Sequence, residues 1–197
     1  MANSKISALT AKTSFADTDE FVLVDNASTP ATKKITGADL KLSVLAALRN
    51  VARVEKTTHT QYNSTIPADN TIPQNTEGSE IFNVSHTPTN ANNYIRVKAV
   101  IGYCHDSSTA SFITAALFKD SGANAVAVQT RFVNISTNND GQIVIDYRVL
   151  AGSTSAATWR LRMGSSSGQT FTVSGRLNTA LFDGVYISSM TVSEEVA

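Results

Sequence analysis

The sequence predicts an all-β protein, and three observations support this prediction. Between residue 79 and the C-terminus, polar and apolar residues alternate along several short segments, as in strands that bury one face. Turn-forming Gly, Asn, Asp and Ser residues recur between these segments at intervals of roughly 8 to 12 residues. Charged residues make up only 16% of the chain, so Ser, Thr, Asn and Gln must supply much of the surface, as on exposed strands.

The first fifty residues differ from the rest of the chain. Residues 21–24 form a short apolar run that an Asp-Asn pair ends, and this run predicts one strand. Thr36 resembles a helix N-cap with Asp39 three positions on, so a helix is expected from about residue 37 to 50. The apolar face of that helix would comprise Leu40, Val44, Ala47 and Leu48. A helix this short is not stable alone, so it must pack against another element or another protein.

Residues 51–66 have mixed polarity, and we expect a connector with room for one edge strand. The next segment, IPADNTIPQNTEGSEIF (66–82), has the features of an entrance into a sheet. Its two prolines stiffen an extended lead-in, and Asp69 with Asn70 can bend it through side-chain–backbone hydrogen bonds. Gly78 then frees the backbone to enter a strand. The expected organisation is an N-terminal module (1–50), a connector (51–66) and a main domain (67–197).

From residue 79 the alternation predicts strands over most of the chain. In the clearest run, Arg96 and Lys98 point to one face, and the opposite face carries Ile95, Val97, Ala99 and Ile101. Further runs lie at 143–149, 159–163 and 170–174, and turn residues separate the runs at 120–122, 139–141, 164–168 and 183–184. About nine strands are expected between residue 53 and the C-terminus, which favours a sandwich close to a jelly roll.

Charge and targeting patterns narrow the classes of function. The formal net charge is zero and the isoelectric point about 6.8, so the sequence gives no electrostatic basis for nucleic-acid binding. No stretch is long and apolar enough to span a membrane, and the N-terminus lacks the pattern of a signal peptide. We therefore expect a chain that is made in a cytosol, is not exported by that route and does not insert into membranes.

The most enzyme-like motif is Cys104-His105-Asp106, which contains the only cysteine. A nucleophile and its base must come within hydrogen-bonding reach, but adjacent side chains on a strand point to opposite faces. A buried cysteine followed by a turn is therefore the favoured interpretation. A glycan-cleaving enzyme would also need two carboxylates across a cleft, and the acidic residues are sparse and mostly in turns. We expect no catalytic residues.

Metal and cofactor sites are not predicted either. His59 and His86 have no carboxylate at a ligand-like interval, and no Cys/His spacing resembles a zinc site. Asp69 and Glu77 lack the run of oxygen donors of a calcium loop, so capping and turn roles are favoured for both. A metal held on a symmetry axis by one repeated side chain stays open.

Residues 66–82 together with SHTPTNANNYIRVKAVI (85–101) resemble the opening of a TNF-like jelly-roll domain found in many bacteriophage tail and fibre proteins. Further matches lie at 116–120, 147–152, 159–162 and 181–195. Asp183 departs from the family, which often has Gly next to the residue matching Gly184. The resemblance implies a homotrimer of jelly rolls on a virus particle.

Residues 5–41 resemble a short N-terminal module that is common on phage structural proteins, with Lys-Ile-Ser, an Asp-rich turn, a valine strand and Thr-Lys-Lys-Ile. This resemblance implies that the module joins the trimer to other proteins of the tail or capsid, in a virion assembled in the cytoplasm of a bacterial host. The candidate virion-anchoring residues are Phe21, Leu23, Leu40, Val44 and Leu48.

Two non-enzymatic functions follow from the resemblance. The first is a short tail fibre or receptor-binding tip that attaches to a glycan or protein on the host surface, and the second is a capsid decoration, cement or head-fibre protein. Polar loops on a rigid β scaffold suit recognition, and such loops are expected at 106–109, 120–125, 136–141 and 164–169. The candidate receptor-facing residues are Asp106, Ser107, Ser108, Thr109, Asn138, Asn139, Ser165 and Ser166.

Overall fold

The computed structural model describes residues 20–24, 32–36, 50–134 and 138–197, and the chain divides into two compact units, residues 1–49 and 50–197. In the first unit, β1 (Glu20–Val24) pairs antiparallel with β2 (Thr32–Thr36). The strand predicted at 21–24 is thus confirmed, and Phe21 and Leu23 lie on it. The helix predicted over 37–50 lies outside the described residues except for Asn50, and so do the anchoring candidates Leu40, Val44 and Leu48.

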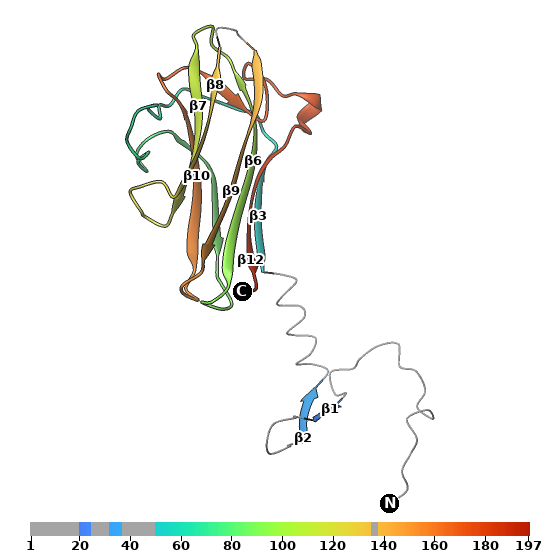
Figure 1. Ribbon diagram of the computed structural model, residues 1–197. Coiled ribbons are helices and arrows are strands. Elements are labelled where there is room, and N and C mark those ends of the chain that lie inside the picture. The colour runs from blue at the N-terminus through green and yellow to red at the C-terminus, as the bar shows by residue number, and fades with distance from the viewer. Residues whose placement is uncertain (1–19, 25–31, 37–49, 135–137) are drawn as a thin grey trace, which may run out of the picture. The chain divides into compact units, whose positions relative to one another are not determined.

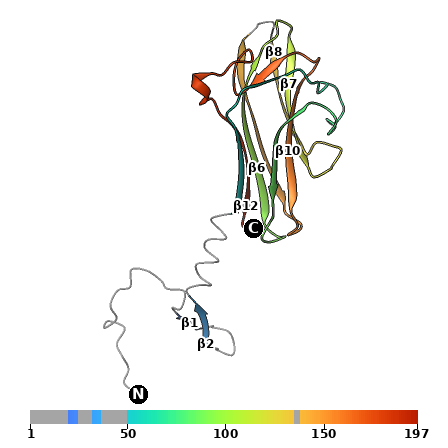
Figure 2. The same ribbon diagram turned by 180° about the vertical axis from the view of Figure 1, so that it is seen from behind.

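The second unit is a sandwich of two antiparallel sheets, which confirms the all-β prediction (Figures 1 and 2). One sheet has the order β5 (Ser79–His86), β10 (Ala157–Ser165), β7 (Ser111–Lys119) and β8 (Ala127–Val133). The other comprises β3 (Val51–Lys56), β12 (Ser188–Glu195), β6 (Tyr94–His105), β9 (Asn139–Leu150), β11 (Phe171–Val173) and β4 (Thr60–Tyr62).

Strand β6 is the centre of the larger sheet. One of its edges pairs with β9 along all twelve residues, from Tyr94 to His105. The other edge pairs first with β12, along residues 94–100, and then with β11, along residues 103–105. Gly102 lies between the two partner segments, and its backbone amide donates a hydrogen bond to Ser188 Oγ at 3.1 Å. A Cβ at Gly102 would overlap the Tyr186 ring, so glycine is required there.

The core lies between the two sheets and comes from the alternating residues that the sequence predicts. Arg96 and Lys98 are exposed on the outer face of β6, and the apolar residues between them are buried. Trp159 on β10 is 1% exposed and packs with Tyr147 of the other sheet, with ring centroids 6.2 Å apart. The fully enclosed side chains include Val97, Ala99, Ile101, Leu117, Leu161, Met163 and Val192. Burial of these side chains from both sheets provides the main stabilisation of the sandwich.

The structure differs from the sequence prediction in two places. Residues 51–66, predicted as a connector, contain β3 and β4, so the sandwich begins before residue 67; β3 pairs with β12 and β4 with β11. Residues 139–141, predicted as a turn, belong to β9 and pair with the end of β6. Gly141 fits inside this strand because the Tyr103 ring occupies the space beside it, where a Cβ would come within 2.7 Å.

Candidate functional site

The segment that enters the sandwich lies on the outer face of the β5–β10–β7–β8 sheet. Ile66 is fully buried there against Ala116 and Phe118, which point away from the central core. The amide of Ile66 donates to the Ser165 carbonyl at 3.0 Å. The segment therefore covers part of a sheet face that would otherwise expose apolar side chains to water.

The predicted turn residues shape this segment as expected. Asp69 Oδ1 accepts hydrogen bonds from the Thr71 hydroxyl at 2.6 Å and the Thr71 amide at 2.8 Å, and both lower the pKa of Asp69. Glu77 accepts from the Gln74 amide at 3.0 Å, so its turn role is confirmed. Gly78 has a φ of +64°, and a Cβ there would lie 2.7 Å from the Met163 carbonyl oxygen. Both the backbone conformation and the space require glycine.

Next to this covered region lies an open groove of about 570 Å³, which we call the outer groove. Its wall is the segment 67–73, and its floor is the outer face of β7 and β8. The Thr114 and Thr130 hydroxyls bond to each other at 3.0 Å across the floor. At one end the rings of Phe112 and Phe132 meet with centroids 5.1 Å apart.

The outer groove is mainly apolar, and its lining leaves several large side chains in contact with water. Ile72 is 54% exposed, and Val126 and Val128 are each more than one-third exposed. This surface was not predicted from the sequence. A usable indication was the largely apolar run from Ile113 to Phe118, interrupted only by Thr114, because a strand that is apolar on both faces needs cover on both.

Most of the predicted receptor-facing residues share one end of the sandwich, which we call the distal end. There β6 ends at His105 and β7 begins at Ser111 (Figure 1). The exposed candidates are Ser108, Thr109 and Asn138. The partly buried ones are Asp106, Ser107, Ser166 and Asn139, which is the first residue of β9. Ser165 was wrongly predicted to face solvent: it is fully buried because β10 continues through it beneath Ile66.

The predicted loop at 120–125 does not belong to the distal end. It follows the far end of β7 and is tied to the entering segment, since the Ala125 amide donates to the Pro73 carbonyl at 2.9 Å and the Asn75 amide to the Ala123 carbonyl at 2.8 Å. Residues 136 and 137 of the predicted loop 136–141 lie outside the described residues. The structure thus brings together the loops 106–110 and 166–170 and Asn138 at one end.

The Cys104-His105-Asp106 motif serves the structure of the distal end. Asp106 accepts hydrogen bonds from the Thr172 hydroxyl at 2.5 Å, the Gln61 amide nitrogen at 3.0 Å and the Leu177 backbone amide at 3.0 Å. Cys104 is fully buried, and burial together with the Asp106 and Asp140 carboxylates raises the pKa of its thiol. A thiol that stays protonated at neutral pH is a poor nucleophile. The expected buried cysteine before a turn is confirmed.

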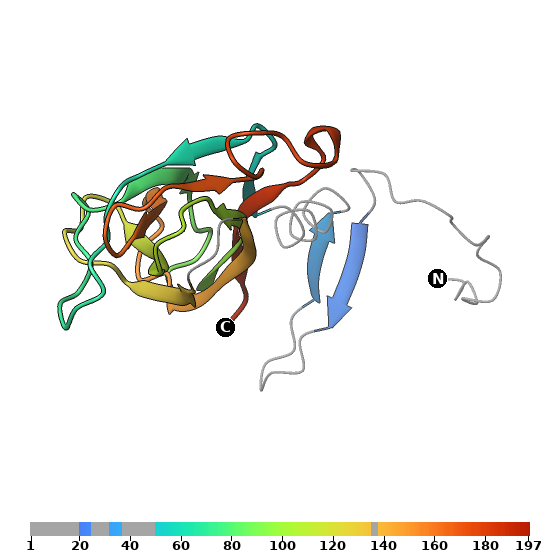
Figure 3. The same cartoon turned by 90° about the horizontal axis from the view of Figure 1, so that it is seen from above.

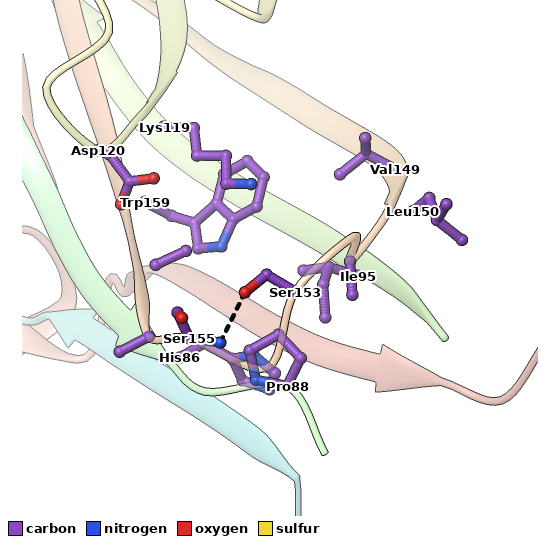
Figure 4. A pocket seen from close by; sticks show the side chains of 13 residues that line it. His86, Pro88, Ile95, Lys119, Asp120, Val149, Leu150, Ser153, Ser155 and Trp159 are labelled. Atoms are coloured by element: carbon purple, nitrogen blue, oxygen red, sulfur yellow. Dashed lines mark hydrogen bonds between the residues drawn. The ribbon is translucent and has the colours of Figure 1, made fainter. Parts of the chain in front are cut away.

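A second, smaller hollow of about 100 Å³ lies at the opposite end, which we call the proximal end (Figure 4). Its lining includes Trp159 and Lys119, whose ammonium lies 5.8 Å from the indole centroid. His86 is buried beside it, and its Nε2 lies 3.2 Å from the carbonyl oxygen of Asn50. The Ser155 amide donates to the Ser153 hydroxyl at 3.0 Å and closes the loop over the hollow.

Glu194 organises the backbone at the proximal end. Its carboxylate accepts hydrogen bonds from the Thr89 amide at 2.8 Å, the Thr89 hydroxyl at 2.9 Å, the Asn90 amide at 3.1 Å and the Asn93 side chain at 2.8 Å. The side-chain amide of Asn50 also donates to it. Burial alone would raise the pKa of Glu194, but these donors outweigh it and lower the pKa. One carboxylate therefore joins the start of the sandwich, the loop 87–93 and β12.

Within the part of the chain that the structure describes, no three His, Cys, Asp or Glu side chains are grouped so that they could hold a metal ion. The helices of that part include none with the length and apolar character needed to cross a membrane.

No protein-family model and no curated protein sequence matches this chain. Among solved structures, the C-terminal domain of the sugar-binding protein EclA matches 60% of this chain and 74% of its own length, with 15% identity and a TM-score of 0.35. The infectious bursal disease virus Gx strain structure matches 89% of this chain and 41% of its own, with 12% identity and a TM-score of 0.37.

The enzymatically active domain of tailspike protein 4 from bacteriophage CBA120 matches 76% of this chain and 20% of its own, with 13% identity and a TM-score of 0.26. This chain thus spans less than half of the virus and tailspike chains. At TM-scores below 0.5, these similarities establish neither a family nor a function.

Proposed function

We propose that the protein is a non-enzymatic structural component of a bacteriophage virion, a short tail fibre or receptor-binding tip. In this proposal the N-terminal unit attaches to another virion protein, the sandwich forms a homotrimer, and the distal end contacts the host surface.

The order of the strands supports the jelly-roll part of the proposal. The four long strands β3, β12, β6 and β9 lie side by side in one sheet, and β5, β10, β7 and β8 lie side by side in the other. Along the chain these strands pass between the sheets as two interleaved Greek keys, the pattern of an eight-stranded jelly roll, which viral capsid and lectin domains use. Strands β4 and β11 extend the sheet at the distal end.

The functional part of the proposal rests on the difference between the two ends of the sandwich. Asn50, where the chain enters from the N-terminal unit, lies at the proximal end beside Glu194. The candidate recognition loops lie at the distal end, beyond the twelve residues of β6, a distance of roughly 40 Å at 3.3 Å per residue. Attachment at one end and polar loops at the other suit a protein that projects from a particle toward a surface.

The engagement of the carboxylates favours binding over hydrolysis. Asp106, Asp140 and Glu194 each accept hydrogen bonds from neighbouring side chains or amides. The outer groove is lined by a single carboxylate, that of Asp69. Hydrolysis of a glycoside requires two carboxyl groups that face each other across the substrate.

Labelled antibody and electron microscopy on purified particles test the proposal directly. We expect a few copies at the tail, and purified protein should compete with the phage for adsorption to host cells. Location on the head in many copies, or release of fragments from host polysaccharide by the purified protein, would contradict it.

Substitutions at the distal end test where the receptor binds. Thr109→Arg and Ser108→Arg place a long charged side chain on an exposed part of the end, and we expect cell binding to weaken about tenfold or more. Thr154→Arg is the matched control, because Thr154 is also exposed but lies in the loop at the proximal end. Equal effects of all three variants would place the receptor contact elsewhere.

A capsid decoration or head-fibre protein is the second candidate. The two compact units adjoin in sequence at Arg49 and Asn50, which leaves no length for a fibre shaft between them. A compact trimer whose attachment module directly precedes the sandwich in the sequence suits a shell ornament. Copy number distinguishes the candidates, because a decoration protein would be present in hundreds of copies on the head.

A further inference from the structure

The loop between β11 and β12 forms an open hollow beside the larger sheet. This loop, residues 176–187, stands away from the two sheets when the sandwich is seen from the side and from the distal end (Figures 1 and 3). The hollow has a volume of about 260 Å³, and we call it the Phe182 hollow. One of its lining residues lies on β9 and the others on the loop: Asp140, Arg176, Leu181, Phe182 and Tyr186.

The floor of the Phe182 hollow rests on the larger sheet. Gly102 of β6 lacks the Cβ that would overlap the Tyr186 ring, so this ring lies directly against the strand. Burial raises the pKa of the Tyr186 phenol, which therefore stays a neutral hydroxyl group at neutral pH. The hollow thus has an uncharged base that the fold holds in place.

Phe182 forms an aromatic wall that is open to water. Its side chain is 72% exposed, and its ring lies at 86° to the Tyr186 ring, with centroids 6.3 Å apart. Phe182, Asp183 and Gly184 have strained, left-handed φ values of 49°, 56° and 85°. The Gly184 amide donates to the Leu181 carbonyl at 3.0 Å. Residues other than glycine keep such a backbone only where surrounding contacts hold it, so the direction of Phe182 is fixed.

Asp140 and Arg176 form the polar wall as a bidentate ion pair. The Arg176 guanidinium donates from Nε to Asp140 Oδ1 at 3.3 Å and from Nη2 to Asp140 Oδ2. These two bonds use two of the roughly five N–H groups of a guanidinium and two of the about four acceptor positions of a carboxylate. Both side chains are about 40% exposed, so further donors and acceptors lie side by side within reach of a ligand. Such a wall suits two neighbouring hydroxyl groups, since each hydroxyl both donates and accepts.

The charges around the hollow select a neutral ligand. Within the lining only Asp140 and Arg176 are charged, and they neutralise each other, so a charged ligand would compete with their pair. Asp183 lies on the same turn, exposed and outside the lining. Its carboxylate repels an anionic ligand at the rim.

The shape of the hollow selects a single ring. A volume of about 260 Å³ is smaller than the roughly 300–1,000 Å³ of pockets for drug-sized ligands. The polar wall bonds neighbouring hydroxyl groups, and the Phe182 ring packs against an apolar surface. A neutral pyranose combines these properties, because C–H groups cover the faces of the ring and hydroxyl groups surround its edge.

We propose that the Phe182 hollow binds one neutral pyranose residue of a glycan. A C–H face of the sugar packs on Phe182, and two neighbouring hydroxyl groups bond to Asp140 and Arg176. The hollow opens beside the distal end, because Asp140 pairs with Cys104 near the end of β6. The inference deepens the receptor binding of the proposed function, and it rests on that function for the source of the glycan, the host surface.

Simple glycosides test the ligand class with the full-length protein. The probes are the methyl glycosides of glucose, galactose, mannose, rhamnose and N-acetylglucosamine, followed by saturation-transfer NMR and calorimetry. We expect at least one to bind with a Kd on the order of 1 mM, as for a small ligand in an open site. Methyl glucuronide and methyl galacturonide should bind at least tenfold more weakly than the best neutral glycoside. No binding of any neutral glycoside, or preference for the uronic acids, would overturn the proposal.

Substitutions at the aromatic wall test the site. Phe182→Leu keeps an apolar side chain but removes the ring, and Phe182→Tyr keeps the ring. We expect Phe182→Leu to raise the Kd of the bound glycoside at least tenfold and Phe182→Tyr to leave it within about twofold. Phe132→Leu is the matched control, because Phe132 is a 56% exposed phenylalanine on β8 of the other sheet. Unchanged binding by Phe182→Leu, or an equal loss with Phe132→Leu, would overturn the assigned site.

Asp140→Asn tests the polar wall, since it keeps the shape of the side chain but weakens its bonds to Arg176 and to the sugar hydroxyls. We expect the Kd to rise at least fivefold. The fluorescence of the buried Trp159 shows whether each variant is folded in the assay. Binding by folded Asp140→Asn as tight as that of the native chain would overturn the role of the ion pair.

The failure of this inference can be told from the failure of the proposed function. Glycoside binding that depends on Phe182, in a protein that does not compete with the phage for adsorption, would sustain the sugar site and contradict the proposed function. Competition for adsorption without any glycoside binding would overturn the sugar site and leave the proposed function intact. If Phe182→Leu then also weakened the competition, the loop would contact a protein receptor.

Discussion

Glu194→Gln is expected to destabilise the sandwich by removing the charge at the centre of the proximal-end network. In the native chain one carboxylate oxygen accepts from the Thr89 hydroxyl, the Asn90 amide and the Asn93 side chain. The other accepts from the Thr89 amide and the Asn50 side chain. Glutamine keeps one acceptor oxygen but places an NH₂ group, itself a donor, where the second oxygen was.

The size of the effect follows from this geometry. About two hydrogen bonds to a charged group are lost, and each contributes roughly 1.5–3 kcal/mol when well shielded. Glu194 is only partly buried, so water replaces some of the lost bonding. We expect the free energy of unfolding to fall by about 2–3 kcal/mol, which for a domain of this size lowers Tm by roughly 5–10 °C.

Trp159 provides the assay, since it is the only tryptophan and lies in the core of the sandwich. Urea unfolding followed by its fluorescence, at one fixed protein concentration, measures the difference between variants. Glu195→Gln is the matched control, because Glu195 pairs with Arg96 and Arg148 on the outer face, where ion pairs contribute little. Equal losses for Glu194→Gln and Glu195→Gln would refute the reasoning.

The pH dependence gives a second criterion. The folded state lowers the pKa of Glu194 from its ordinary value of 4.5, so the network stabilises the protein above that pH and loses its effect as the pH falls through the lowered value. The stability difference between the native chain and Glu194→Gln should therefore shrink as the solution is acidified below about pH 4.5. A difference that stays constant down to pH 3 would show that the charge plays no part.

Two further predictions concern single residues. Gly78→Ala should lower the free energy of unfolding by about 2–4 kcal/mol, because the new Cβ meets the Met163 carbonyl. Gly152→Ala, at a similar φ of +68° but with nothing within 4 Å of the new Cβ, should lower it by about 1 kcal/mol. Thermal unfolding of the two variants side by side separates the effect of the contact from that of the backbone conformation. Cys104 should resist alkylation by iodoacetamide in the folded protein at pH 7–8 and react fully in urea, since burial raises the pKa of its thiol; rapid labelling of the native chain would mean that the distal end opens readily.

The fold could be predicted from the sequence where one face of a strand is buried and the other is exposed to solvent. Ile95 to Ile101 alternate cleanly for that reason, and the structure buries each predicted apolar residue. The pattern fails in β3, where the chain alternates only between exposed and half-buried positions at the edge of the sheet. Its partner, β12, lies more than 130 residues away in the sequence, so no turn-forming residues between adjacent strands indicate the pairing.

The surfaces were harder to predict than the strands. The outer groove depends on residues 67–73 lying over a sheet face formed by β7 and β8, and no periodicity within one segment encodes such a distant contact. The loop 176–187 depends on Phe182 and Asp183 adopting positive φ, which is uncommon for residues other than glycine and most of all for a bulky residue such as Phe. Asp183 was the position at which the family resemblance broke, and it lies in the strained turn.

The pairing of β3 with β12 has a consequence for synthesis. β3 is among the first strands of the sandwich to leave the ribosome, and β12 is the last, so β3 and one edge of β6 wait unpaired while the intervening residues are made. Contacts this distant make folding slow and largely post-translational. A product that terminates before Ser188 exposes two strand edges and cannot close the sheet, so it is open to proteolysis or aggregation. Only chains that include β12 can complete this sheet, and the topology itself thereby acts as a check on completeness.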